Sequence, residues 1–70
     1  MKYAVVIEKA SSNYSAYVVD LPGCVATGST FAEVECEIRE AIELHLEGLR
    51  REGIEVPQPS SAVEYVEVAA

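Results

Sequence analysis

One segment constrains this chain more than any other, because residues 30–51 have signals for both ends of a long helix. Thr30 and Glu33 fit a capping box, in which the Thr30 hydroxyl accepts from the Glu33 N–H and the Glu33 carboxylate accepts from the Thr30 N–H. The basic pair at positions 50 and 51 suits the negative end of a helix. Gly53 suits the left-handed position that terminates one. The sequence therefore predicts a helix that begins after Thr30 and ends near Arg51.

This helix is amphipathic. At 100° per residue, one stripe holds its apolar residues and the chain's single histidine: Phe31, Val34, Ile38, Ala41, Ile42, His45, Leu46 and Leu49. We expect His45 to pack, because catalysis would need a nucleophile and an orienting carboxylate nearby. A helix of this length spans about 31 Å at 1.5 Å per residue. A seven-residue strand reaches only about 23 Å, so the helix should overhang its sheet or meet another chain.

The segments around the helix have strand character. Residues 2–8, 14–20 and 24–27 are short and rich in β-branched residues, and turn-forming residues separate them. A proline-containing connection over 53–61 leads to a last strand-like segment at 62–68. The predicted order is β-β-β-α-β, an α+β fold in which an antiparallel-type sheet carries one long helix on one face. Seventy residues make a single domain, 1–70, with a thin core.

A single helix covers one face of a sheet, so the other face keeps apolar side chains from the first two strands. Monomers rarely expose large apolar patches, and we therefore expect a homo-oligomer, a dimer or a tetramer.

Charge narrows the choice of partner. Five Lys and Arg against twelve Asp and Glu give a net charge of −7. Nucleic-acid binding depends on basic contacts to phosphate, so direct binding of DNA or RNA is disfavoured. A basic protein is the favoured partner, since complementary charge speeds encounter. Cys24 and Cys36 lack a metal-binding spacing. The absence of a leader pattern and of a long apolar run favours a reduced, cytoplasmic protein without membrane contact.

Four glutamates form an acidic row on the side of the helix opposite the apolar stripe. Glu33, Glu37, Glu40 and Glu47 lie there around Leu44. A solvated helix face is the usual reason for such a row, and a metal site is disfavoured. Like charges at this spacing repel one another by a few tenths of a kcal/mol per pair. Docking of a basic partner, which would relieve that repulsion, is the functional alternative.

A second candidate is the turn from Asp20 to Cys24, which reads Asp20, Leu21, Pro22, Gly23 and Cys24. An aspartate at a strand end can be catalytic, but aspartate also stabilises turns, and we favour the turn role. Cys24 has no cation or helix N-terminus placed to lower its pKa, so a packed thiol is favoured over a nucleophile. A recognition role for this turn and a purely structural one both stay open.

These pieces together resemble the HicB antitoxin family. The resemblance rests on the D-L-P-G-C turn at 20–24, the G-S-T-F run at 28–31, the R-E-A-I-E-L run at 39–44 and the opening strand, and it extends through the whole chain. It implies a partial ribonuclease-H-like fold. It also implies an antitoxin that binds and occludes HicA, a small basic mRNA-cleaving toxin, without a catalytic residue, metal or cofactor of its own.

Two features limit the resemblance. Family members often continue into a C-terminal DNA-binding segment, and this sequence stops at Ala70, so we expect no such domain within it. Fold does not imply function, and a two-metal nuclease needs several convergent carboxylates, whereas Asp20 is the only aspartate. The alternatives are an orphan ligand-binding or scaffold module and, least favoured, a degenerate nuclease. As recognition surfaces we predict the acidic row with Leu44 and the turn 20–24.

Overall fold

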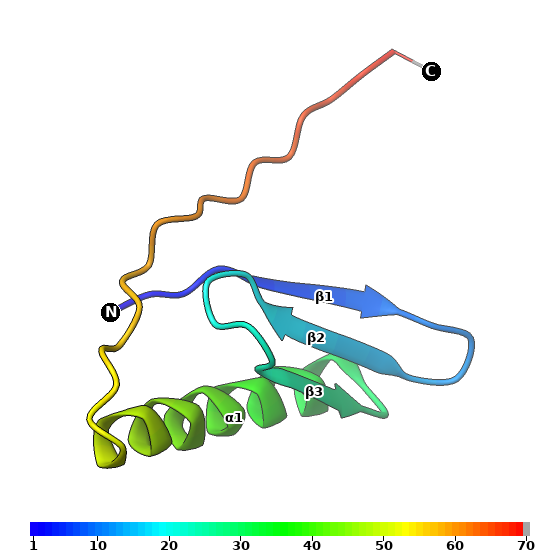
Figure 1. The fold of residues 1–70 in the computed structure, drawn as a ribbon. Helices are drawn as coiled ribbons and strands as arrows, with labels where there is room; N and C mark the ends of the chain where they lie inside the picture. Colours follow the sequence, from blue (N-terminus) through cyan, green and yellow to red (C-terminus); the bar gives the residue numbers. More distant parts are fainter. Residues whose placement is uncertain (70) are drawn as a thin grey trace.

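A computed structural model describes residues 1–69 and shows three strands followed by one long helix (Figure 1). The elements are β1 (Val5–Lys9), β2 (Tyr14–Val18), β3 (Val25–Gly28) and α1 (Phe31–Arg51). The strands form one sheet in the order β1-β2-β3, and both pairs are antiparallel. The α+β prediction, an antiparallel sheet with one helix on one face, is confirmed. The ribonuclease-H-like resemblance stays a prediction.

The helix begins and ends where the sequence predicts. Thr30 is the N-cap, and its hydroxyl oxygen accepts a hydrogen bond from the Glu33 N–H at 3.0 Å. At the other end the Glu52 N–H donates to the Gly48 carbonyl at 3.1 Å, and Gly53 has a φ of +71°. That φ lies in the left-handed region, where glycine is favoured because it has no Cβ. Within residues 1–69 no helix is both long enough and apolar enough to cross a membrane.

The core lies between α1 and one face of the sheet. Successive residues of a strand point to opposite faces, so Ala16 and Val18 of β2 face the helix together. The predicted apolar stripe of α1 meets them. The buried set is Ala16, Val18, Leu21, Cys24, Val34, Ile38 and Leu46. Phe31 differs from the prediction, because it is half exposed at the rim and packs edge-on against Tyr14, with ring centroids 6.2 Å apart.

The end of β3 touches the backbone of α1 directly. A Cβ added to Gly28 would lie 2.6 Å from the Val34 backbone nitrogen and 2.9 Å from its Cα. Both distances are shorter than real Cβ contacts allow. Gly28 is therefore required for the close approach of strand and helix.

The expected overhang of the helix is present. The C-terminal half of α1 extends past the strands, beneath the first residues of the chain and the tail (Figure 1). Leu21, from the turn after β2, and Val56, from the tail, join the same apolar cluster as Leu46 and Leu49. The turn and the tail thus cover the part of the helix that the sheet does not reach.

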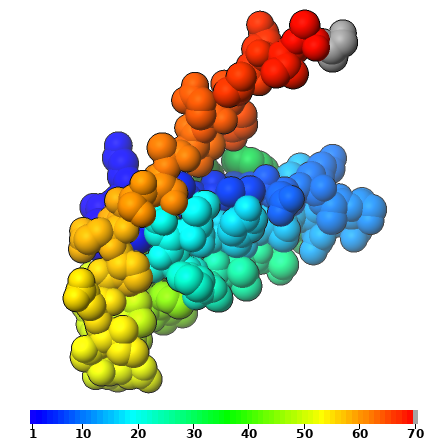
Figure 2. Space-filling view, turned by 45° about the horizontal axis from the view of Figure 1, so that its top comes forward, coloured from blue at the N-terminus to red at the C-terminus, as the bar shows by residue number. Residues whose placement is uncertain are grey.

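The predicted strand over 62–68 does not form in the single chain. Within the described part of the tail, residues 53–69 contain no strand, and all of 62–69 are exposed. The end of the tail stands clear of the body (Figures 1 and 2). Strand propensity reflects packing on a pleated surface beside a hydrogen-bonded neighbour. The segment has strand-forming residues but no strand beside it.

Candidate partner-binding surface

The acidic row lies on the solvent side of α1, as expected from its period. Its members and the leucine between them are all exposed: Glu33, Glu37, Glu40, Leu44 and Glu47. Leu44 is 69% exposed, although burying a leucine fully is worth roughly 1.5–3 kcal/mol. Single exposed apolar side chains are common on protein surfaces, so it is the acidic row around Leu44 that makes this face a candidate surface.

Leu44 and three glutamates line a shallow depression of about 320 Å³ on this side of the helix. Two of the glutamates, Glu40 and Glu47, are in the predicted row, and the third, Glu43, was missed by the sequence analysis. The signal was available, because Glu43 lies three residues after Glu40 and four before Glu47. Glu47 is paired with Arg51 at 2.6 Å. Both side chains are largely exposed, so the pair contributes little to stability.

The turn after β2 has a structural role in the single chain. Leu21 is fully buried and Cys24 is 4% exposed. The Cys24 N–H donates to the Leu21 carbonyl at 3.1 Å, and the Val18 N–H donates to the Cys24 carbonyl at 3.1 Å. Only Pro22 and Gly23 are exposed at its tip, where Gly23 has a φ of +84°. A partner could therefore contact little of this turn beyond its tip.

Asp20 holds the C-terminal tail. Its Oδ2 accepts hydrogen bonds from the N–H groups of Ser60 at 3.0 Å and Ser61 at 2.9 Å. Its Oδ1 accepts from the Ser61 hydroxyl at 2.8 Å and the Ser60 hydroxyl at 3.3 Å. These bonds, those of Ser61 above all, lower the pKa of the Asp20 carboxyl. We call this arrangement the serine clasp, and it accounts for the only aspartate in the chain.

The described residues offer little for catalysis. Burial raises the pKa of the Cys24 thiol, which makes it a poor nucleophile at neutral pH. His45 is half-buried on α1. Among residues 1–69 no three His, Cys, Asp or Glu side chains converge to hold a metal ion.

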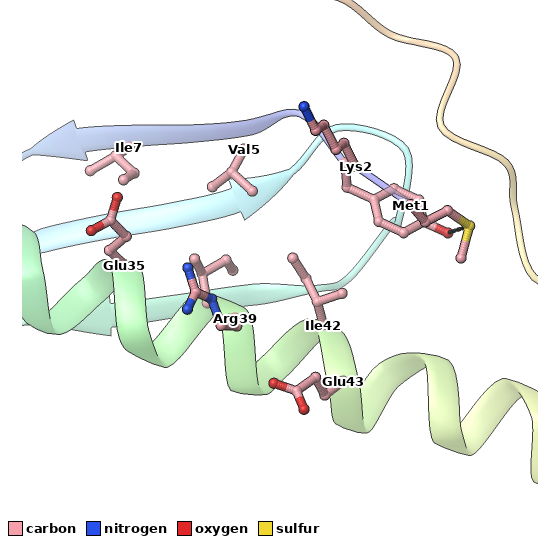
Figure 3. A pocket seen from close by; sticks show the side chains of 10 residues that line it. Met1, Lys2, Val5, Ile7, Glu35, Arg39, Ile42 and Glu43 are labelled. Atoms are coloured by element: carbon pink, nitrogen blue, oxygen red, sulfur yellow. Dashed lines mark hydrogen bonds between the residues drawn. The ribbon is translucent and has the colours of Figure 1, made fainter.

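A second concavity, which the sequence analysis missed, lies between β1 and α1 (Figure 3). It has a volume of about 560 Å³ and an apolar floor that includes Val5, Ile7, Ile38 and Ile42. Lys2, Glu35, Arg39 and Glu43 are among the charged residues at its sides. We call it the β1 groove. The period of β1 identifies which residues face the helix, but only the structure shows that Val5 and Ile7 stay partly open to solvent there.

Comparisons with known proteins agree with this geometry. A family model for the HicB-like antitoxin of bacterial toxin-antitoxin systems matches residues 3–69. The chain is 35% identical over 66 residues to an uncharacterized 14.9 kDa protein from the rep-hol intergenic region of Haemophilus phage HP1, a match that covers 94% of this chain. It spans only 50% of the phage protein. It is also 38% identical over 64 residues to a UPF0150 protein of Thermoplasma acidophilum, covering 87% of this chain and 90% of that protein.

A solved structure extends the likeness to three dimensions. A HicA3 and HicB3 toxin-antitoxin complex contains a chain that superimposes with a TM-score of 0.74 at 33% sequence identity. The match covers 86% of this chain and 70% of that one. Sequence and fold therefore lead to the same conclusion: the chain belongs to the family of HicB-like antitoxins of bacterial toxin-antitoxin systems.

Proposed function

We propose that this protein neutralises a small, basic, HicA-like mRNA-cleaving toxin by binding and covering it. The observation that carries the proposal is Leu44, an exposed leucine among glutamates on α1 of a HicB-like chain. The likeness to a chain of a HicA3 and HicB3 complex supports a toxin as the partner. Occlusion needs no catalytic group, so the antitoxin is not an enzyme in this proposal.

The physical basis is a small apolar centre with an acidic border. Tight interfaces concentrate their binding energy in a few central side chains that lose water on docking. Leu44 is the central apolar side chain of this kind. The surrounding carboxylates would steer a basic toxin and set the salt dependence of binding. The net charge of −7 adds a long-range attraction. The turn 20–24 is a lesser candidate surface, because only Pro22 and Gly23 are exposed there.

Self-association is part of the proposal. The sheet face away from α1 exposes Tyr17 at 44%, Val19 at 41% and Val25 at 64%. Apolar side chains on an uncovered sheet face favour a homo-oligomer, a dimer or a tetramer. Two free cysteines suit a reducing compartment, and an mRNA-cleaving toxin acts in the cytoplasm, where we place the pair.

Co-expression with a toxin tests the proposal. The partner to use is the basic, histidine-containing product of the neighbouring reading frame. We expect it to arrest growth alone and the antitoxin chain to restore growth. Arrest that persists despite expression of the folded antitoxin would refute the function.

A matched pair of variants tests the surface. Glu37→Lys, Glu40→Lys and Glu47→Lys together should weaken toxin binding at least about tenfold, or about 1.4 kcal/mol, and flatten its salt dependence. The control is an equal charge change away from the row, at the exposed Glu8, Glu52 and Glu55. Equal affinity of the two triple variants would move the interface away from α1. Leu44→Ala then separates the contribution of the apolar centre from that of charge.

A further inference from the structure

We propose that residues 62–68 of one chain add as a fourth strand to the free edge of β1 in a second copy, over its β1 groove. This inference rests on the proposed self-association and is independent of toxin binding. Three features support it: an unpaired sheet edge, an unpaired strand-forming segment, and an apolar groove beside the edge.

The edge is β1, which within residues 1–69 pairs only with β2. The Val19 N–H donates to the Ala4 carbonyl, and the Ala10 N–H donates to the Asn13 carbonyl. Hydrogen-bonded pairs alternate along an antiparallel ladder, so residues 4, 6, 8 and 10 use their polar groups toward β2. The N–H and C=O groups of Val5, Ile7 and Lys9 therefore point outward. Such a row is a ready template for another strand.

The segment is the end of the tail, whose seven residues read A-V-E-Y-V-E-V. Three β-branched residues and a tyrosine give it strong strand character. Tyr65 is 92% exposed, Val66 74% and Val68 76%. Apolar strand-forming residues left in water are expected to find a sheet edge. Seven residues are enough to pair along the whole of β1, which has five.

The groove supplies the apolar surface that such a strand would cover. Val5 and Ile7 from β1 and Ile42 from α1 turn toward the space between strand and helix (Figure 3). Its sides hold Lys2 and Arg39 but also Glu35 and Glu43, so their charges balance. The tail contributes Glu64 and Glu67. A register that sets Glu64 and Glu67 beside Lys2 and Arg39, and away from Glu35 and Glu43, is therefore the favoured one.

The geometry points to a second copy as the source of the strand. The serine clasp fixes Ser60 and Ser61, and the chain beyond them runs clear of its own sheet (Figures 1 and 2). Every chain then presents one free tail and one free groove. Two copies related by a twofold axis can fill both grooves with both tails, which closes the assembly. The same contact hides both β1 edges from further pairing.

Two measurements on the full chain, taken together over a range of concentrations, test the proposal. Sedimentation equilibrium gives the mass, and amide hydrogen exchange gives the protection of residues 62–68. We expect the mass to at least double and the tail amides to become protected over the same concentration range. A monomer with a protected tail would mean that the tail pairs with its own β1, which overturns the proposal.

The remaining outcomes separate this inference from the claim on which it rests. An oligomer with an unprotected tail would overturn strand addition while self-association stands. A monomer with an unprotected tail at every concentration would overturn both. Neither result bears on rescue from the toxin, which is scored by growth.

Variants check the two surfaces. Val66→Pro removes a strand N–H and should weaken association at least about tenfold. Ala69→Pro, the same change just outside the segment, should leave association unchanged. Arg39→Glu should also weaken it, and adding Glu64→Lys and Glu67→Lys should restore it. Because these side chains lie outside the core, circular dichroism should show an unchanged fold. Because only alternate N–H groups of a strand face its neighbour, Tyr65→Pro is tested beside Val66→Pro. Association of both variants equal to that of Ala69→Pro would overturn the proposal.

Discussion

Replacing Gly28 with alanine puts a methyl group against the backbone of α1. The new Cβ would lie 2.6 Å from the Val34 nitrogen, about 0.8 Å closer than ordinary van der Waals contact begins. The three nearest neighbours are backbone atoms, so no side chain can rotate away, and β3 must move relative to the helix. Overpacking of this kind costs about 1–3 kcal/mol. For a domain of this size that lowers the melting temperature by about 4–8 °C per kcal/mol.

Gly48 provides the matched control. It lies inside α1, and a Cβ added there has nothing within 4 Å. Alanine is favoured over glycine in a helix by roughly 0.5–1 kcal/mol, so Gly48→Ala should raise the melting temperature by about 2–8 °C. Thermal and urea unfolding of both variants, each at the same protein concentration, measures the two changes of opposite sign. Gly28→Ala as stable as the wild type would refute the close approach of β3 and α1.

Further predictions follow from the core, the clasp and the two thiols. Leu21→Ala should destabilise the fold by about 2–5 kcal/mol in urea unfolding, since Leu21 is fully buried; a loss under 1 kcal/mol would contradict that. Asp20→Asn should speed amide exchange at Ser60 and Ser61, and unchanged exchange would refute the clasp. The folded-state pKa of Asp20 is lowered, so the clasp should be fully formed above the ordinary aspartate pKa. It should open as the pH falls through the lowered pKa, and NMR chemical shifts of the tail amides would report the opening. A thiol reagent should modify Cys36 well before Cys24; equal rates would contradict the burial of Cys24.

Both ends of the helix could be predicted closely because their signals are local. Thr30 and Glu33 are three positions apart, and Gly53 follows the last turn directly, so each signal acts within one turn of chain. The period that separates Val34 and Ile38 from the acidic row is likewise a property of the helix alone. The acidic row with Leu44 was accessible for the same reason.

Contacts between distant parts of the chain could not be read in the same way. The hydrogen bonds of Asp20 reach residues 40 and 41 positions away, and nothing in the pattern around Asp20 identifies those partners. Residues 62–68 show the opposite problem. Their strand propensity is plain, but a strand exists only beside another strand, and propensity does not say which one. The β1 groove was missed because it depends on how β1 and α1 pack together, which leaves Val5 and Ile7 partly open.

The serine clasp anchors the C-terminal segment at Asp20. The eight residues from 62 to 69 follow this anchor, so they lie within about 26–29 Å of the turn after β2. A fluorophore attached after this segment would report on surroundings within that distance of the turn after β2. Weakening the serine clasp by Asp20→Asn should therefore widen the distribution of distances from such a label to the sheet and helix.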